Sequence, residues 1–224
     1  LGAASLGAQP KYGGMGLPFL VEACANEVIM RACPSTGLNI VWFGGISAIV
    51  EKFGSEEIKD FVVPRIVSGE WSGSMGLTEA DAGSDLGSLR AYGEKQPDGT
   101  WKLYGSKRFI SNGCSQVCLV LAMNGKGVKG LNNLNMFLCL RKPPFRLDGQ
   151  EDSKVEFNYT VNKIEEKLGL HGSATCEINF DGSVAYLLGE NGKGFQHMLH
   201  LMNDARIAVG FQALGNMEAI YRLS

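Results

Sequence analysis

The sequence predicts an α+β protein in which helices come first, a block of strands follows and a helix closes the chain. Three patterns lead to this class: apolar spacings of three and four before Trp71, alternation and turn residues after it, and helical spacing again from Gly194. Because the patterns occupy separate blocks, they favour α+β over alternating βαβ units. We expect N-terminal helices over 1–70, an antiparallel β-barrel or sandwich over 71–188, and the start of a C-terminal helical domain over 189–224.

The first block reads as three helices. Apolar residues recur at helical spacing at Leu17, Leu20, Val21, Cys24 and Val28, and Pro18 stands where a first turn tolerates proline. A second helix is expected from Gly37 to Phe53, with Gly54 as its stop. Ser55 is placed as the N-cap of a third helix.

The second block reads as strands joined by turns. Pro97-Asp98-Gly99 is turn chemistry, and short apolar runs of strand length occupy 117–123 and 134–140. Cys176, Ile178 and Phe180 alternate with polar residues, which is typical of a half-buried strand. Residues 141–166, with Pro143-Pro144, are expected to form an extended loop.

Composition limits the classes of partner. The chain has 21 basic and 23 acidic side chains, a net charge of −2, so we expect neither a nucleic-acid nor an anionic-membrane partner. No apolar run reaches the roughly 18 residues that a membrane span needs. Six cysteines without a secretory signal predict reduced thiols and a cytoplasmic protein. The chain begins at Leu1 and ends within a helical pattern, so it reads as an internal piece of a longer protein.

Three patterns that resemble functional motifs have simpler interpretations. Residues 125–130 match G-x-G-x-x-G, but strand-like residues follow where a dinucleotide site needs a helix, so we expect a mobile hairpin loop. His197 and His200 lack a third metal ligand at a suitable spacing, and we expect helix surface or packing roles and no metal site. Cys114 and Cys118 are interpreted as small apolar fillers rather than nucleophiles.

Two segments together suggest a binding site. Residues 74–85 run from a strand into a loop of small and hydroxyl residues, where Thr78, Gly83 and Ser84 could hold a flat heterocycle and a phosphate. A solvated polar turn explains this segment alone equally well. Residues 104–113 add an aromatic ring and a hydroxyl two positions apart, at Phe109 and Ser111. Because residues two apart on a strand share a face, a ring that can stack on a flat ligand would lie beside a hydroxyl that can hydrogen-bond to it.

These segments resemble a known family. The patterns T-E-x-x-x-G-S-D at 78–85 and G-S-K-x-F-I-S-N-G at 105–113 are similar to those of acyl-CoA dehydrogenases. Tyr12-Gly13-Gly14 upstream and 167–173 downstream fit the same family in the same order. The stretch 168–195 resembles in particular the branch that includes the FadE-type and methylmercaptopropionyl-CoA dehydrogenases.

The resemblance implies an FAD site and a substrate site. It implies flavin contacts from Met75, Leu77 and Thr78, with Ser84 near the pyrophosphate or the CoA, and a second flavin edge formed by Phe109, Ile110 and Ser111. It also implies substrate contacts from Asn203, Asp204 and Arg206. The sequence departs from the family at Ala80-Asp81, where Pro-Gly is usual. It also departs at Phe109, where Trp is common, so the aromatic surface available for stacking is smaller.

The implied activity is FAD-dependent α,β-dehydrogenation of an acyl-CoA in fatty acid β-oxidation. An electron-transfer flavoprotein would accept the electrons, and the full-length protein would be a homodimer or homotetramer. Ala205 stands before Arg206 where a minority of the family places the catalytic glutamate, so we expect no catalytic base in these residues and no activity of the piece alone. An acyl-CoA oxidase-like flavoenzyme and a flavin-free β-sandwich binding module stay open as alternatives.

Overall fold

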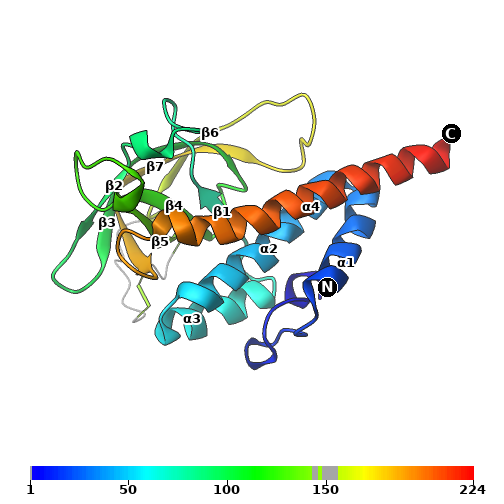
Figure 1. The fold of residues 1–224 in the computed structure, drawn as a ribbon, viewed down its shortest axis with the longest axis horizontal. Helices are drawn as coiled ribbons and strands as arrows, with labels where there is room; N and C mark the ends of the chain where they lie inside the picture. Colours follow the sequence, from blue (N-terminus) through cyan, green and yellow to red (C-terminus); the bar gives the residue numbers. More distant parts are fainter. Residues whose placement is uncertain (1, 143–145, 148–155) are drawn as a thin grey trace.

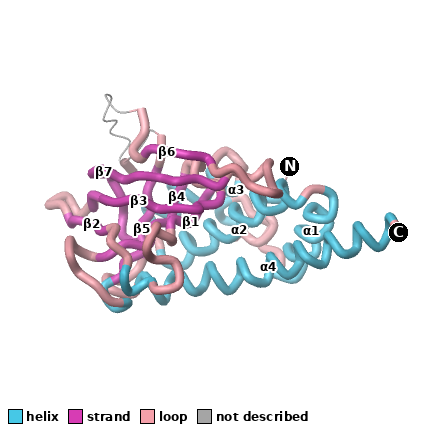
Figure 2. Tube along the Cα trace, turned by 90° about the horizontal axis from the view of Figure 1, so that it is seen from above, coloured by secondary structure: helices cyan, strands magenta, loops and turns pink. Residues whose placement is uncertain are grey.

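The structure is a computed structural model and describes residues 2–142, 146–147 and 156–224. The strands gather at one end of the molecule and the helices at the other, with one long helix running from the barrel along the helical layer (Figure 1, Figure 2). Short 3₁₀ turns occur at Ala3–Ser5, Pro10–Tyr12, Leu86–Ser88 and Leu131–Asn133.

Three helices build the first block: α1 (Phe19–Ala32), α2 (Pro34–Phe53) and α3 (Glu56–Val67). Pro34 separates α1 from α2, because proline has no N–H to donate and keeps the preceding residue out of the helical region. Cys33 accordingly has an extended backbone. The predicted cap of α3 is confirmed, since Ile58 N donates to Ser55 Oγ at 3.3 Å.

Among the described residues, seven strands form one sheet: β1 (Gly73–Gly76), β2 (Tyr92–Lys95), β3 (Trp101–Ser111), β4 (Val117–Met123), β5 (Leu134–Leu140), β6 (Thr160–Ile164) and β7 (Thr175–Leu188). Strands β4, β5, β7, β3 and β2 pair in turn, and Tyr92 of β2 returns to Met123 of β4, which closes a barrel. β1 adds to β4 and β6 adds to β7. The predicted turn at 97–99 connects β2 to β3.

Two cores explain the continuous apolar runs of β4 and β5. In β4, alternate residues face in opposite directions: Leu119 and Leu121 belong to the core between barrel and helices, whereas Cys118 and Val120 belong to the core inside the barrel. Phe137 and Leu138 divide β5 in the same way. Because both faces of these strands are buried, the sequence shows no polar alternation there.

Helix α4 (Gly194–Leu223) packs against α1 and α2, so the last element of the chain joins the first two in one layer. The approach to α1 is close at Gly215, where an added Cβ would lie 3.0 Å from both Arg31 N and Glu27 O. A glycine at this position therefore lets the two backbones meet. In the part of the chain that is described, no helix is both long enough and apolar enough to cross a membrane.

The structure corrects three expectations. The sheet is not wholly antiparallel, because β1 runs parallel to β4; the β2–β3 hairpin lies between them in the chain and lets β4 return in the same direction. The apolar stripe that predicted α1 is the outward one, with Leu20, Val21 and Val28 exposed. The buried residues of α1 are instead Ala23, Asn26 and Met30.

The third correction concerns the expected loop over 141–166. This segment contains β6, which pairs with β7 through residues such as Val161 and Ile178. Strand β6 is short and polar, so its pattern did not stand out from that of a loop. Pro143-Pro144 and residues 148–155 lie outside the described residues.

Candidate functional site

A buried lysine on β3 anchors the loop that follows β1. Lys107 has no exposed surface, and its Nζ donates to Glu79 Oε1 at 2.8 Å and to the Leu77 carbonyl at 3.0 Å. Burial lowers the pKa of Lys107, and the negative charge of Glu79 partly offsets this effect. The lysine thus holds both ends of residues 77–79 against the barrel.

Glu79 has two further donors that fix its carboxylate. The backbone N–H of Arg90 donates to Oε2 at 2.7 Å and that of Ala91 donates to Oε1 at 3.0 Å. Each carboxylate oxygen is therefore partnered, as a buried charge requires. The loop from 77 to 84 begins on a rigid base rather than as a free solvated turn.

The two polar segments predicted to meet do meet. Arg108 N donates to the Thr78 carbonyl at 2.8 Å, and Asn112 Nδ2 donates to the Gly73 carbonyl at 2.9 Å. These bonds lie on either side of Ser111 and tie β1 and its loop to the end of β3. Thr78 and Ser111 therefore belong to one region of the surface.

A bulge in β3 presents Phe109 to solvent. The register with β7 shifts between Lys107 and Ile110, and Phe109 has a φ of 58°, which is unusual for an aromatic residue. Its side chain is 61% exposed, whereas Ile110 is buried inside the barrel. Phe109 is exposed and Ser111 is half-buried, whereas the buried side chain of Ile110 leaves only its backbone to face a ligand.

The other predicted flavin contacts differ in exposure. Ser84 is exposed in the loop, and Leu77 and Thr78 are half-buried. Met75 is buried in the core between barrel and helices. An added Cβ on Gly83 would lie 3.2 Å from Thr78 Cγ2, so glycine keeps the space above Thr78 open.

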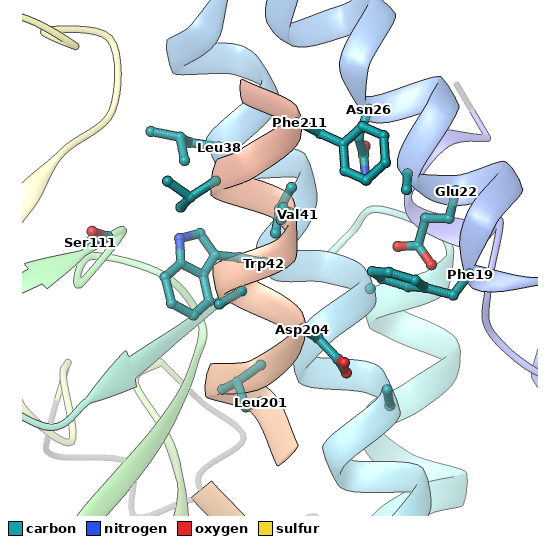
Figure 3. A pocket seen from close by; sticks show the side chains of 17 residues that line it. Phe19, Glu22, Asn26, Leu38, Val41, Trp42, Ser111, Leu201, Asp204 and Phe211 are labelled. Atoms are coloured by element: carbon teal, nitrogen blue, oxygen red, sulfur yellow. The ribbon is translucent and has the colours of Figure 1, made fainter. Parts of the chain in front are cut away.

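An apolar cavity of about 220 Å³ lies between α1, α2 and α4 and reaches Ser111 of β3 (Figure 3). Trp42 lies on the side of Ser111, and Phe19, Glu22 and Asn26 lie on the side of α1. The lining also includes Leu38, Val41, Gly44, Gly45, Ala48, Leu201, Asp204, Ala205, Ala208, Val209 and Phe211.

The predicted substrate residues on α4 separate into two groups. Asp204 lines the cavity, and it also lines a neighbouring open cleft of about 540 Å³. Asn203 and Arg206 do not line the cavity; Arg206 Nη1 donates to Asn203 Oδ1 at 3.0 Å on the exposed surface of the helix. The structure thus brings Asp204, but neither of its two neighbours, to the cavity beside Ser111.

Sequence reasoning missed Glu22, Asn26 and Trp42. In α1, Phe19, Glu22, Ala23 and Asn26 follow the spacing of one helix face, so two polar residues stand on a stripe that faces α2 and α4. Polar residues on the inward face of a helix indicate a candidate binding site. The outward face of α1 is more apolar, so hydrophobicity favoured it as the buried face and the signal was overlooked. Burial, then the charge of Asp204, raises the pKa of Glu22.

Cys114 is not an apolar filler. It is exposed, and a hydrogen bond from Cys176 lowers the pKa of its thiol to about 6. Burial instead raises the pKa of Cys118 to about 11. The interpretation as a filler holds for Cys118 alone, because only that side chain alternates into the barrel.

His197 and His200 contact residues at the end of α2, and the glycine-rich segment lies in a loop. The His197 ring packs on Phe53 at a centroid distance of 4.1 Å, and Lys52 Nζ lies 3.2 Å from His200 Nδ1. Residues 125–130 belong to the connection between β4 and β5. No group of three potential metal ligands occurs among the residues whose placement is described.

Two family models match the chain, and both describe acyl-CoA dehydrogenases. The N-terminal domain of that family matches residues 1–70, and the middle domain matches residues 74–183. The chain belongs to the acyl-CoA dehydrogenase family.

Individual relatives support this assignment. The chain is 35% identical to the 3-methylmercaptopropionyl-CoA dehydrogenase of Ruegeria pomeroyi, over 99% of this chain and 38% of that protein. The structure of butyryl-CoA dehydrogenase from Megasphaera elsdenii superposes with a TM-score of 0.86 at 30% identity, over 97% of this chain and 55% of that one. An acyl-CoA dehydrogenase from Bacillus anthracis, solved in complex with FAD, has a TM-score of 0.81 at 25% identity, over 96% and 34%. The chain thus spans 34% to 55% of the length of these three relatives.

Proposed function

We propose that the full-length protein containing this chain is an FAD-dependent acyl-CoA dehydrogenase, which converts an acyl-CoA thioester to the 2-enoyl-CoA. One observation carries the proposal: the loop 77–84 is joined by hydrogen bonds to the end of β3, and Ser111 at this junction lines an apolar cavity. A cofactor held at the junction would lie beside the acyl chain held in the cavity.

The residues at the junction fit a flavin. Phe109 offers an exposed ring that can stack on a flat heterocycle, and Thr78 and Ser111 supply hydroxyls that can hydrogen-bond to the heterocycle's polar edge. Gly83 leaves the surface above Thr78 open, and the exposed Ser84 beside it suits the pyrophosphate or the CoA. We place Leu77, Thr78, Phe109 and Ser111 against the ring, with Met75 and Ile110 contributing backbone only.

FAD, when bound, would supply the acceptor for the hydride that leaves the β-carbon. The chain's own residues have three tasks: the anchored loop fixes the cofactor, the apolar walls of Trp42 and Leu201 exclude water, and α4 orients the substrate. Exclusion of water strengthens each electrostatic contact to the thioester carbonyl as negative charge develops on it.

The general base belongs outside these residues in our proposal. Ala205 lines the cavity where a base on α4 would stand, and it has no proton acceptor. Glu22 and Asp204 are the carboxylic acids of the cavity lining, but Glu22 lies on the side opposite Ser111 (Figure 3). We therefore expect the 224-residue chain alone to show no dehydrogenase activity.

The remaining assignments follow from the same proposal. We assign the full-length protein to the cytoplasm, as a homodimer or homotetramer that passes electrons to an electron-transfer flavoprotein. The middle domain would extend over 71–188, between part of an N-terminal helical domain at 1–70 and the first helix of a C-terminal helical domain at 189–224.

Anaerobic titration of the purified full-length protein with acyl-CoA tests this function. We expect a yellow protein whose visible flavin absorbance bleaches on addition of a saturated acyl-CoA. A colourless protein that cannot be reconstituted with FAD would support a flavin-free binding module. Rapid reoxidation of the reduced protein by oxygen, together with slow reaction with electron-transfer flavoprotein, would identify an oxidase.

A further inference from the structure

The far end of the cavity is polar although its walls are apolar. Asn26 is only 6% exposed, it lines the cavity, and its Oδ1 has no hydrogen-bond partner among the described residues. A buried polar atom without a partner costs free energy unless a ligand or water satisfies it. Oδ1 of Asn26 therefore marks a place where a hydrogen-bond donor on the ligand would be favourable.

Glu22 stands one helical turn before Asn26 on the same side of the cavity (Figure 3). Its carboxyl occupies space left by two glycines: an added Cβ would lie 2.5 Å from Oε2 at Gly7 and 2.2 Å from Oε1 at Gly44. Any larger residue at these two positions would displace the carboxyl. The packing of three separate segments thus sets this acid at the cavity wall.

In the described part of the chain, no basic side chain lines the cavity beside these acids. Among the described residues that line it, Glu22 and Asp204 are charged and none is basic. Lys52, which lines the adjoining cleft, has its Nζ 3.2 Å from His200 Nδ1. Among the described residues, the end of the cavity therefore presents two carboxyl groups and the unpartnered Oδ1 of Asn26, with no basic side chain in the lining.

We propose that the acyl group taken by this site ends in a hydrogen-bond donor, a hydroxyl or an ammonium group, which Glu22, Asn26 and Asp204 accept at the end of the cavity away from Ser111. The inference rests on the proposed function, because it assumes that the thioester lies beside Ser111. A plain alkyl end would leave Asn26 Oδ1 without a partner, and sites built to hydrogen-bond a substrate reject analogues that lack the group. An ammonium end also offsets the negative charge of the two carboxylates, whereas a hydroxyl carries no charge to offset it.

The test compares CoA thioesters of matched length that end in a methyl, a hydroxyl or an amino group, across a series of chain lengths, with the full-length FAD-loaded protein. We expect kcat/KM at the best length to be at least about tenfold higher for a donor-ended chain than for the methyl-ended one. Superiority of the amino compound would identify the ammonium as the natural group, and superiority of the hydroxyl compound would identify the alcohol. Equal or better kcat/KM for the methyl series at every length would overturn the inference.

Binding without turnover supplies an independent readout. Thioether analogues of the same three series cannot be dehydrogenated, and their dissociation constants can be measured by calorimetry. We expect Glu22→Gln to reduce the preference for the amino end about tenfold or more, and Asn26→Leu to reduce the preference for either donor. Glu27→Gln is the matched control, because Glu27 lies on the same helix but is paired with Arg31 and does not line the cavity.

The outcomes separate this inference from the proposed function. Dehydrogenation of methyl-ended acyl-CoAs without discrimination by Glu22 or Asn26 would contradict the inference and leave the proposed function standing. Failure to bind any acyl thioether or to dehydrogenate any acyl-CoA would contradict both. If Asn26→Leu does not fold, Glu22→Gln still tests the inference, because it replaces one carboxyl group with an amide of equal size.

Discussion

Lys107 Nζ on β3 lies 2.8 Å from Glu79 Oε1 in the loop after β1, and the lysine side chain has no exposed surface. This ion pair joins segments 28 residues apart and sets the loop that we assign to the flavin. Burying two charges is costly unless further hydrogen bonds support them; here Lys107 also donates to the Leu77 carbonyl, and two backbone N–H groups donate to Glu79. The Lys107–Glu79 pair therefore positions the loop. Substitution of either residue would leave the charge of the other buried without a counter-ion.

Substitution Lys107→Met should destabilise the protein by about 3 kcal/mol, because Glu79 loses its counter-ion inside the protein. Urea unfolding would measure the change in the free energy of unfolding. Lys102→Met provides the control, since Lys102 is exposed on the same strand and should have little effect. Equal effects of the two substitutions would contradict the anchoring role.

Thr78→Val and Ser111→Ala should each weaken FAD retention by roughly threefold to tenfold, the effect of one hydrogen bond of about 0.5–1.5 kcal/mol. Titration of the apoprotein with FAD measures this directly. Ser106→Ala on the same strand is the matched control, because its hydroxyl bonds to Asn179 outside the junction. Unaltered FAD affinity in both variants would reject the assigned site.

Glu22→Gln should stabilise the protein at neutral pH and not at acidic pH. Burial, then the charge of Asp204, raises the pKa of Glu22 in the folded state above its unfolded value. The folded protein therefore binds more protons than the unfolded chain between these two pKa values, and stability falls as the pH rises through that window. Denaturant unfolding at pH 7 and at pH 4 would compare the two proteins. A loss of stability of the same size at both pH values would contradict this view of the carboxyl.

Cys114 should be alkylated by iodoacetamide with an apparent pKa near 6, whereas Cys118, buried and with a pKa of about 11, should not react in the folded protein. Cys176→Ala should move the reaction of Cys114 towards the ordinary thiol pKa of about 8.5, since the hydrogen bond from Cys176 is the largest cause of the shift. Peptide mapping after timed alkylation measures both rates. A pH profile of Cys114 that does not change in Cys176→Ala would disprove the pairing.

The sequence was most informative where one physical cause decides the pattern. The apolar runs 117–123 and 134–140 coincide with β4 and β5, because both faces of these strands are buried. Ser55 caps α3 as predicted, since capping is a local interaction. The motifs at 78–85 and 105–113 also identified two segments that tertiary structure joins.

Other features depend on contacts that a single sequence does not display. Lys107 is fully buried because Glu79 and the Leu77 carbonyl receive its donors, and nothing near Lys107 in the chain indicates this. The bulge that exposes Phe109 arises from the register with β7. In α1, the more apolar stripe faces outward, so hydrophobicity alone indicated the wrong face.

The central claim is that the loop 77–84 and the end of β3 hold a flavin between them. A crystal structure of the full-length protein with FAD tests it most directly. We predict the isoalloxazine within hydrogen-bonding distance of the Thr78 and Ser111 hydroxyls, with the Phe109 ring against it. Electron density for FAD elsewhere, with both hydroxyls facing solvent, would contradict the account.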